Sequence, residues 1–535
     1  MTPDEWIAHD PDPQTAAELA ACGPDELAAR FARPLRFGTA GLRGPVRGGP
    51  DAMNVAVVSR ATWAVAQVLG NRAGSRVIVG RDARHGSATF ATVAAEVLAA
   101  EGFSVLLLPG PVPTPVVAFA VRHTGAAAGI QITASHNPPT DNGYKVYFDG
   151  GIQIVSPADR QIETAITAAP PADQITREPV APNGNSATDL VERYIERAAG
   201  VRRSTGSVRV ALTPLHGVGG AVAVETLRRA GFEYVHTVGA QFAPDPDFPT
   251  VAFPNPEEPG ATDALLALAA DVHADVAIAL DPDADRCAVG IPTGSGWRML
   301  SGDETGWLLG DYILSQTDNP ETAAETRIVA STVVSSRMLA AIAAHYGAVH
   351  VETLTGFKWL ARADANLPTG RLVYAYEEAI GHCVDPAAVR DKDGMSAAVL
   401  VCDLVAALKK QGRSVPEVLD ELARRHGVHQ VAAVSRRVAD ADEAADLMRR
   451  LRAAPPDRLA GFAASISRIS EITDPLIFTG GDANTAVRVV VRPSGTEPKL
   501  KCYLEVRCTV AGDLRATRRR AGALLDQLVT SVRDW

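Results

Sequence analysis

The amino-acid sequence predicts several α/β domains followed by a smaller α+β unit. The chain has 535 residues, which is too long for one hydrophobic core and suggests three or four domains. The same order of strands and helices occurs three times, and the pattern changes near Gly427. Strands that alternate with helices form α/β layers with largely parallel pairing. We therefore expect three similar α/β domains with mixed, largely parallel sheets, and one smaller C-terminal α+β domain.

Each repeat begins with a strand rich in β-branched residues and continues with an Ala-rich helix, a second strand, another helix and a third strand. The first strands are expected at 76–80, 208–212 and 327–331, the Ala-rich helices at 87–101, 220–230 and 335–346, the second strands at 103–108, 234–238 and 348–354, and the third strands at 125–133, 274–280 and 371–376.

Two stretches mark domain boundaries. Residues 170–188 are rich in Pro, Ala, Asn and Ser, which is typical of a linker. After Gly427 the sequence predicts a strand, a helix, two strands and a terminal helix, at 429–438, 440–454, 486–491, 499–508 and 512–532. The expected domains are 1–187, 188–301, 302–426 and 427–535.

The composition is that of an ordinary globular protein, with 46% hydrophobic and 21% charged residues. The formal net charge of -10 argues against nucleic acid as a partner. The most apolar run, residues 395–408, is too short to cross a membrane and contains Asp403. Residues 1–13 are acidic and Pro-rich, unlike a signal peptide. The six cysteines have no metal-type spacing, so we expect reduced thiols in a cytoplasmic protein.

All three predicted third strands end in a polar loop. The loops span residues 133–137, 281–286 and 377–382. Ligand-binding groups gather at the carboxyl ends of the strands in such sheets. Three different chemistries at three equivalent positions predict one site that is assembled from three similar domains.

The first loop contains a candidate nucleophile, Ser135. Asn137, Pro138 and Pro139 force a turn directly after it. His136 and Lys145 are close in sequence, as a phosphate-carrying serine and its substrate would require. The alternative is a serine that only caps a helix, which the motif alone does not exclude.

The second loop contains three alternating carboxylates, Asp281, Asp283 and Asp285. Pro282 disfavours helix, so an extended loop is expected, with the three side chains on one side. Oxygen ligands without His or Cys favour magnesium over zinc. The alternatives are a solvated acidic turn, or calcium without the EF-hand spacing.

A candidate phosphate-binding loop lies between the last two predicted strands. Gly495 allows backbone amides to approach an anion, Ser494 and Thr496 offer hydroxyl donors, and Arg492 offers a bidentate fork. Such a loop suits a phosphate monoester. The alternative is an ordinary polar hairpin turn.

Further candidates carry weaker signals. Arg43 ends a glycine-rich turn that begins at Phe37, and Lys358 ends the Gly-containing loop 355–358. Either could bind phosphate, and either could be a structural turn. In the third loop, Glu377, Glu378 and His382 could bind sugar hydroxyls or move protons, although a lone His is more often structural.

Taken together, these motifs resemble the α-D-phosphohexomutase family, which includes phosphoglucomutases and phosphomannomutases. The match runs from Phe37 to Glu505, with the motifs in the family's order. The resemblance implies four domains around a central cleft, with a last domain that can rotate to close the cleft. It also implies one magnesium ion per chain, and a sugar bisphosphate as intermediate and activator.

The resemblance assigns roles to single residues. Ser135 carries the phosphoryl group and supplies an oxygen to the magnesium ion. Arg286 and Lys145 flank the transferring phosphoryl group, and Lys145 or His382 moves the proton of the attacking hydroxyl. The metal ligands are Ser135, Asp281, Asp283 and Asp285. The substrate-binding set is Arg43, His136, Lys358, Glu378, Arg492, Ser494, Gly495 and Thr496.

One departure concerns the sugar. The family's sugar loop usually reads Gly-Glu-x-Ser-Gly-His, whereas Ile380 stands here in place of the serine. The loop is similar to that of the branch containing phosphopentomutases and their glucomutase relatives. The expected reaction interconverts 1- and 6-phosphates of glucose and/or mannose, and the alternative is a pentose 1- to 5-phosphate mutase. A metal-dependent sugar phosphatase and a non-catalytic sugar-phosphate binder are the remaining alternatives. Monomer and dimer both stay open.

Overall fold

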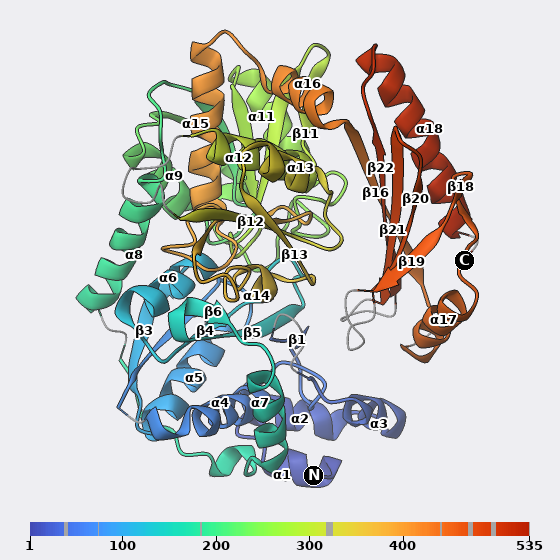
Figure 1. Ribbon diagram of the computed structural model, residues 1–535. Helices are drawn as coiled ribbons and strands as arrows, with labels where there is room; N and C mark the ends of the chain where they lie inside the picture. Colours follow the sequence, from blue (N-terminus) through green and yellow to red (C-terminus); the bar gives the residue numbers. More distant parts are fainter. Residues whose placement is uncertain are drawn as a thin grey trace.

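The protein is described by a computed structural model that covers residues 1–36, 41–72, 74–181, 184–316, 325–438, 441–468, 475–493, 499–533 and 535. Three mixed sheets with flanking helices fill most of the molecule, and a fourth, antiparallel sheet with α18 stands apart on the right of Figure 1. The predicted fold class, three α/β domains and a smaller α+β domain, is confirmed.

The first domain is built on the sheet β1-β5-β4-β2-β3, with β6 paired to β5. Its strands are β1 (Leu42–Pro45), β2 (Arg76–Arg81), β3 (Ser104–Pro111), β4 (Ala128–Ile132), β5 (Asp141–Phe148) and β6 (Ile152–Gln153). Its helices are α1 (Pro3–Ala8), α2 (Pro13–Ala21), α3 (Pro24–Ala32), α4 (Val55–Leu69), α5 (Ser87–Ala100), α6 (Thr114–Thr124) and α7 (Ala158–Ala168).

The second domain is built on the sheet β11-β10-β9-β7-β8. Its elements are α8 (Gly184–Ala199), β7 (Arg209–Thr213), α9 (Gly220–Arg229), β8 (Tyr234–Thr237), α10 (Gly239–Phe242), α11 (Asp263–Asp271), β9 (Val276–Leu280), β10 (Cys287–Thr293) and β11 (Gly296–Met299). Because α8 begins at Gly184, the linker expected up to residue 188 is shorter than predicted.

The third domain is built on the sheet β13-β12-β14-β15. Its elements are α12 (Gly302–Ser315), β12 (Thr326–Thr332), α13 (Met338–His345), β13 (Val349–Thr353), α14 (Phe357–Leu360), β14 (Gly370–Glu377), β15 (Gly381–Cys383), α15 (Gly394–Lys410) and α16 (Val415–His426). The helix expected from residue 335 begins only at Met338, because the hydroxyls of Ser335 and Ser336 bind other parts of the protein.

The fourth domain is built on the sheet β16-β22-β21-β20-β19, in which every pair is antiparallel. Its elements are β16 (Val428–Arg437), α17 (Ala441–Ala453), β17 (Arg458–Leu459), β18 (Phe462–Ala463), β19 (Ser465–Arg468), β20 (Leu476–Gly481), β21 (Thr485–Pro493), β22 (Lys499–Cys508) and α18 (Leu514–Arg533). The sequence prediction missed β17 to β20, which are short strands without a long alternating pattern.

The first three sheets share one strand order. In each, the third strand of the repeat lies between the first strand, to which it is parallel, and an antiparallel return strand. The corresponding orders are β5-β4-β2-β3, β10-β9-β7-β8 and β15-β14-β12-β13. The threefold repeat inferred from the sequence is therefore present in the fold.

The turn after each third strand also repeats one unusual backbone geometry. Ser135, Ala284 and Ile380 each have a positive φ, of 53°, 54° and 53°. A side chain other than glycine in this region costs conformational energy, and such residues persist where the surrounding structure holds them. The three loops are thus bent in the same way, and each bend turns the chain back into its antiparallel return strand.

The cores of the domains differ in how they are joined. One hydrophobic cluster runs through the first three domains and contains, for example, Val117, Ile278 and Tyr374. The fourth domain has its own core, which includes Phe478 and Leu504. A small cluster of Val333, Val334, Ile477 and Val490 joins it to the third domain.

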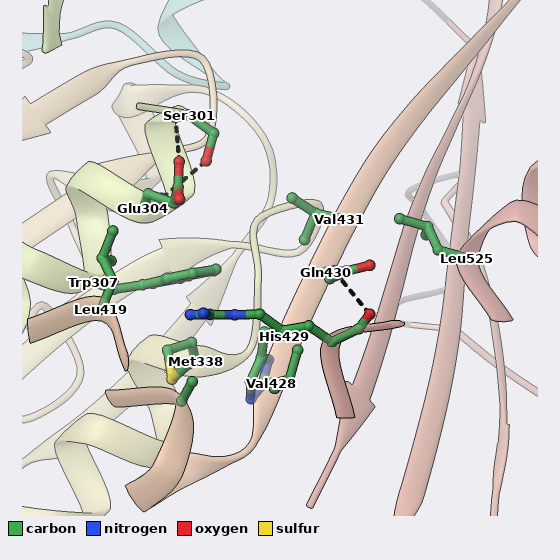
Figure 2. Close-up of a pocket in the computed structure, with 12 residues that line it drawn as sticks. Ser301, Glu304, Trp307, Met338, Leu419, Val428, His429, Gln430, Val431 and Leu525 are labelled. Atoms are coloured by element: carbon green, nitrogen blue, oxygen red, sulfur yellow. Dashed lines mark hydrogen bonds between the residues drawn. The ribbon is translucent and has the colours of Figure 1, made fainter. Parts of the chain in front are cut away.

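The junction between the third and fourth domains also contains a cavity of about 350 Å³. Figure 2 shows Trp307 on one side of this cavity and Gln430, Val431 and Leu525 on the other. The contact between the two domains is therefore incomplete at this point.

Candidate functional site

The loops that follow the three third strands touch one another. Ser135 Oγ donates a hydrogen bond to Asp281 Oδ2 at 2.7 Å, which joins the first loop to the second. The second and third loops are joined through their backbones, because the Cys287 N–H donates to the Ile380 carbonyl at 3.0 Å. The structure therefore brings together the three loops that the sequence placed at equivalent positions.

The turn at Ser135 is held by the side chain of Arg84. This guanidinium donates to the carbonyl oxygens of Ser135 and Asn137, both at 2.6 Å, and of Pro138 at 2.7 Å. Arg84 is buried, and its contacts fix the positive φ of Ser135. Sequence reasoning missed Arg84, although it follows β2, the neighbour of β4, by only three residues.

The three aspartates of the second loop form a compact buried cluster. One carboxylate oxygen from each of Asp281, Asp283 and Asp285 lies within 4.8 Å of the others. The expectation of an extended loop is wrong: the Ala284 N–H donates to the Asp281 carbonyl at 2.8 Å, so the carboxylates converge across a turn.

The cluster fits a hard metal ion. Asp283 Oδ1 and Asp285 Oδ1 are buried and have no hydrogen-bond partner among the described residues. Buried charged oxygens without partners are costly, and a cation relieves that cost. The all-oxygen donor set is the kind that Mg²⁺ and Ca²⁺ take, so these residues could hold such an ion.

Two buried lysines face the same carboxylates. Lys145 Nζ lies 2.6 Å from Asp283 Oδ2 and 2.8 Å from Asp285 Oδ2, and Lys392 Nζ lies 3.3 Å from Asp285 Oδ2. Burial alone would lower the pKa of Lys145, but the two aspartates raise it above its ordinary value. The pKa of Lys392 is raised in the same way by Asp285, Asp391 and Glu377. Both ammonium groups are therefore charged at neutral pH.

Lys392 was not found from the sequence. It lies in the segment between β15 and α15, directly before Asp393, whose side chain caps α15. Nothing in the local pattern distinguishes it from a surface lysine, and only the tertiary fold brings it to Asp285.

Three further predicted residues surround Ser135. His136 Nδ1 lies 3.2 Å from Ser135 Oγ, and Arg43 Nη1 donates to Asn137 Oδ1 at 3.4 Å. Burial, followed by the charges of Arg286 and Arg43, holds the pKa of His136 well below its usual range. Arg286 itself lies 3.5 Å from Glu257 and pairs with Gly381 directly before the return strand β10 of the second loop. The guanidinium groups of Arg286 and Arg43 therefore make this side of the Ser135 loop positive, whereas the His136 ring is neutral.

Steric constraints explain why a glycine stands in the turn before Arg43. A Cβ added to Gly41 would lie 2.0 Å from the Tyr144 carbonyl oxygen, and its φ is +80°. Only glycine allows β1 to approach β5 this closely. The described part of this turn is therefore structural, and it holds Arg43 beside the Ser135 loop.

The third loop presents Glu378 and encloses His382. Glu378 Oε2 accepts hydrogen bonds from Thr332 and Ser335, both at 3.1 Å. The His382 ring is fully buried, stacks against the rings of Tyr374 and Tyr376, and shares a 3.0 Å hydrogen bond with the Tyr374 hydroxyl. Burial lowers the pKa of His382 to about 3, so its ring is neutral at physiological pH. This environment is that of a packed core residue.

The structure describes only part of the predicted phosphate-binding loop. Arg492 donates a hydrogen bond to the Thr355 hydroxyl, in the loop that leads to Lys358. Lys358 Nζ lies 5.7 Å from the centre of the Trp359 ring, and burial lowers its pKa. Ser494, Gly495 and Thr496 lie outside the described residues.

Comparisons with known proteins agree with this architecture. Four models of the phosphoglucomutase/phosphomannomutase family match in order: alpha/beta/alpha domains I, II and III at residues 34–172, 192–294 and 301–426, and the C-terminal domain at residues 434–513. The chain belongs to this family.

Relatives and solved structures extend the match. The chain is 41% identical to a Haemophilus influenzae protein named "Probable phosphomannomutase", over 85% of this chain and 93% of that one. It is 32% identical to the phosphopentomutase of Mus musculus, over 99% and 93%. A phosphoglucomutase/phosphomannomutase family protein from Burkholderia thailandensis shares the fold, with a TM-score of 0.70 at 20% identity, over 93% and 96%.

These matches identify the kind of enzyme. The protein is a phosphosugar mutase, and so an isomerase, that acts on a sugar phosphate. Within the described residues, no helix has the length and apolar character needed to cross a membrane.

Proposed function

We propose that this mutase interconverts the 1-phosphate and 6-phosphate of glucose and/or mannose, with Ser135 as the residue that carries the phosphoryl group. The single observation that carries the proposal is the 2.7 Å hydrogen bond from Ser135 Oγ to Asp281 in the buried aspartate cluster. A helix-capping serine has no use for three buried carboxylates and two buried lysines beside its hydroxyl.

The reaction then consists of two transfers. The phosphoryl group of phosphoserine 135 passes to a free hydroxyl of the sugar monophosphate: the serine P–O bond breaks and a sugar P–O bond forms. The bisphosphate turns over in the central cleft, and its other phosphate returns to Ser135. The product is the isomeric monophosphate, and the enzyme is phosphorylated again.

The charges around Ser135 support this chemistry. Arg286, Arg43 and the two buried lysines offer positive charge for the oxygens of the transferring group. Arg84 holds the loop so that Ser135 Oγ keeps one position, which suits a reaction that depends on alignment. We infer that Asp281, Asp283 and Asp285 hold one Mg²⁺ ion per chain, which supplies Lewis-acid stabilisation of phosphoryl oxygens.

Of the two groups proposed for proton transfer, Lys145 has the stronger support. Its ammonium group is charged and lies against the aspartate cluster, so it can give a proton to the serine oxygen that is left when the phosphoryl group departs. The amine that remains then takes up the proton released by the attacking sugar hydroxyl, so that the proton balance of the transfer closes. His382 is enclosed by tyrosine rings and has a pKa of about 3, which favours a packing role.

The remaining substrate contacts follow from the same proposal. Glu378 receives the sugar hydroxyls, and Arg492, Ser494, Gly495 and Thr496 hold the phosphate that does not react. His136, which lies beside Ser135 Oγ, and Lys358 add further polar contacts to the substrate. Water must be excluded, because hydrolysis of phosphoserine 135 would leave an inactive enzyme.

A pentose phosphate is the second candidate substrate, and Ile380 favours it. This side chain packs into a hydrophobic cluster with Ala277, Ala279 and Ala288, so it offers the sugar no hydroxyl. Several similar proteins are named phosphopentomutase or phosphoribomutase.

A cytoplasmic location is a further inference, supported by five buried free thiols.

The test compares glucose, mannose, ribose and deoxyribose 1-phosphates, each with Mg²⁺ and the matching bisphosphate activator. We expect kcat/KM to be highest for a hexose phosphate. A higher value for a pentose phosphate would replace the hexose assignment by the pentose one. Release of free phosphate as the main product would indicate a phosphatase, and binding without conversion would indicate a sensor.

A further inference from the structure

A second charged cavity lies where the first three domains meet, outside the catalytic loops. It has a volume of about 660 Å³ and is lined by α6, by α8 with the residues that follow it, and by the segment after β15. The helices α6 and α8 are neighbours on the left of Figure 1, far from the fourth domain. None of the residues to which a catalytic or substrate-binding role has been given lines this cavity.

The cavity is rich in arginine although the protein is acidic. Its charged lining consists of four arginines and one histidine against two carboxylates: Arg193, Arg197, Arg202, Arg203, His123, Glu196 and Asp385. The whole chain has a formal net charge of -10. A local excess of arginine in such a chain concentrates anions.

Two of the four arginines already have partners. Arg197 forms a bidentate ion pair with Asp385, at 2.6 and 2.9 Å. Arg202 donates to the carbonyl oxygens of Ala230 and Gly206 and lies 4.2 Å from the centre of the Phe232 ring. These two side chains form the fixed part of the cavity wall.

The other two arginines are free to bind a ligand. Neither the Arg193 nor the Arg203 guanidinium makes a hydrogen bond or ion pair with any residue that the structure describes. Both side chains are exposed to solvent; partial burial lowers the pKa of Arg203, although the nearby charges of Asp403 and Asp385 act to raise it. His123 stacks one face on Phe119 at 5.1 Å, and its exposed ring extends the same wall.

We propose that this cavity is a second anion-binding site and that it takes a small polyanion with at least two negative groups, either a phosphate ester or a polycarboxylate. The planar guanidinium groups of Arg193 and Arg203 match the oxygens of phosphate and carboxylate in a bidentate manner. The described lining has no Ser, Thr or Cys and no cluster of three carboxylates for a metal ion, so the proposed role of the cavity is binding. The volume is sufficient for a ligand of metabolite size.

The position of the site makes it suitable for an effector. Tyr194, next to Arg193 on α8, donates a 2.6 Å hydrogen bond to Asp393. Asp393 directly follows Lys392, whose ammonium group faces Asp285 in the catalytic cluster. An anion bound by Arg193 would therefore contact the same helix, α8, whose Tyr194 holds the segment that contains Lys392.

The test measures binding of inorganic pyrophosphate by titration calorimetry on the full-length protein, without added metal. The wild type should bind two molecules, one in the catalytic site and one in this cavity. The double variant Arg193→Ala, Arg203→Ala should lose the second molecule, with affinity there weakened by roughly tenfold or more. Citrate, run in parallel, distinguishes a polycarboxylate from a phosphate preference.

The control is Arg228→Ala, which removes an exposed arginine of α9 that also lacks a described side-chain partner. It should bind two molecules, as the wild type does. Mutase turnover without pyrophosphate should be unchanged in the double variant, which shows that its fold and catalytic site are intact. If the double variant binds pyrophosphate and citrate as the control does, the proposed site is refuted.

Discussion

The junction among the first three domains differs in kind from the junction between the third and fourth. The first is built from one continuous hydrophobic cluster and from backbone hydrogen bonds at the catalytic loops, such as that from the Thr114 N–H, at the start of α6, to the Asp283 carbonyl at 2.9 Å. The second is built from a few polar side chains, a small apolar cluster and an open cavity (Figure 2). The reacting groups thus lie on the rigid side of the molecule.

The polar contacts of the second junction centre on one carboxylate. Glu505 Oε1 accepts hydrogen bonds from Ser336 Oγ at 2.6 Å and the Arg337 N–H at 2.9 Å, and lies 2.8 Å from His429 Nδ1. Arg488 reaches Glu352 at 3.2 Å beside it. Such a junction can re-form after a movement, whereas a packed core cannot shift without loss of its contacts. The difference fits the proposed function, in which the first three domains align the phosphoryl transfer and the fourth domain is expected to move and to hold the other phosphate.

The largest effect is expected at the rigid junction from Ser135→Ala. The variant keeps the backbone geometry of the loop but has no oxygen to carry a phosphoryl group, so turnover should fall to background. The measurement is a mutase assay, together with the intact mass of the protein, which should show no phosphoryl group. Ser59→Ala, which removes another buried hydroxyl of the first domain, should retain activity. Turnover in Ser135→Ala near that of the wild type would rule out the phosphoserine mechanism.

The next largest effect is expected from Asp283→Asn. The substitution removes one negative charge from the cluster and breaks the ion pair with Lys145. Affinity for Mg²⁺, measured by calorimetry on the unliganded protein, should fall by about tenfold to a hundredfold or more. The rate should become dependent on higher Mg²⁺ concentrations. An unchanged Mg²⁺ titration would place the metal ion elsewhere.

An effect of intermediate size is expected at the mobile side from Arg492→Ala. Loss of a charge-assisted contact to the phosphate should cost about 1.5–3 kcal/mol, which corresponds to roughly tenfold to a hundredfold in KM. The control is Thr355→Val, which removes only the hydroxyl that Arg492 contacts in the third domain. If KM for the monophosphate is the same in Arg492→Ala and the wild type, Arg492 does not hold the substrate.

The sequence was sufficient to predict those features of the fold and of the site that depend on local sequence pattern. The repeated order of strands and helices predicted three α/β domains, and the polar loops after the third strands were expected to meet, as they do. Local pattern was misleading for Asp281 to Asp285, because the alternation suggested an extended chain, whereas Ala284 adopts a positive φ that no propensity indicates. The strands β17, β18 and β19 were missed because each is too brief to show periodicity, and β20 because its sequence, three apolar residues followed by Thr and two glycines, does not alternate.

What the sequence could not supply depends on contacts between distant segments. Arg84 and Lys392 look like ordinary loop residues, and only the fold brings them to Ser135 and Asp285. His382 is a related case: its place in the sugar loop predicts proton transfer, which stays a prediction, whereas the packing of two tyrosine rings around it is a tertiary property that the sequence does not show. The sequence gives the type of each residue, but the burial of its side chain and its contacts in the fold decide what chemistry it can perform.

The smallest effect is expected from Glu505→Gln at the mobile junction. The amide oxygen of Gln can still accept from Ser336 and Arg337, so only the charge opposite His429 is lost. We expect KM for the sugar phosphate to rise by about twofold to fivefold with kcat nearly unchanged, because the amide keeps the hydrogen bonds across the junction; this rise corresponds to roughly 1 kcal/mol or less. The comparison variant is Glu352→Gln, which removes the negative charge that faces Arg488. Because Glu352 is more exposed than Glu505, this variant should raise KM less than Glu505→Gln does.

The pH dependence of stability separates this charge effect from a packing effect. Burial alone would raise the pKa of Glu505, but the hydrogen bond and charge of His429 lower it below its ordinary value of 4.5. A carboxylate with a lowered pKa stabilises the fold above its unfolded-state pKa, and that contribution is lost as the pH falls through the folded-state value. The melting temperature of Glu505→Gln should therefore lie below that of the wild type at pH 7, and the two should converge below about pH 4.5. A constant difference across this range would mean that the substitution acts through packing, and that the fourth domain is not held by this charge.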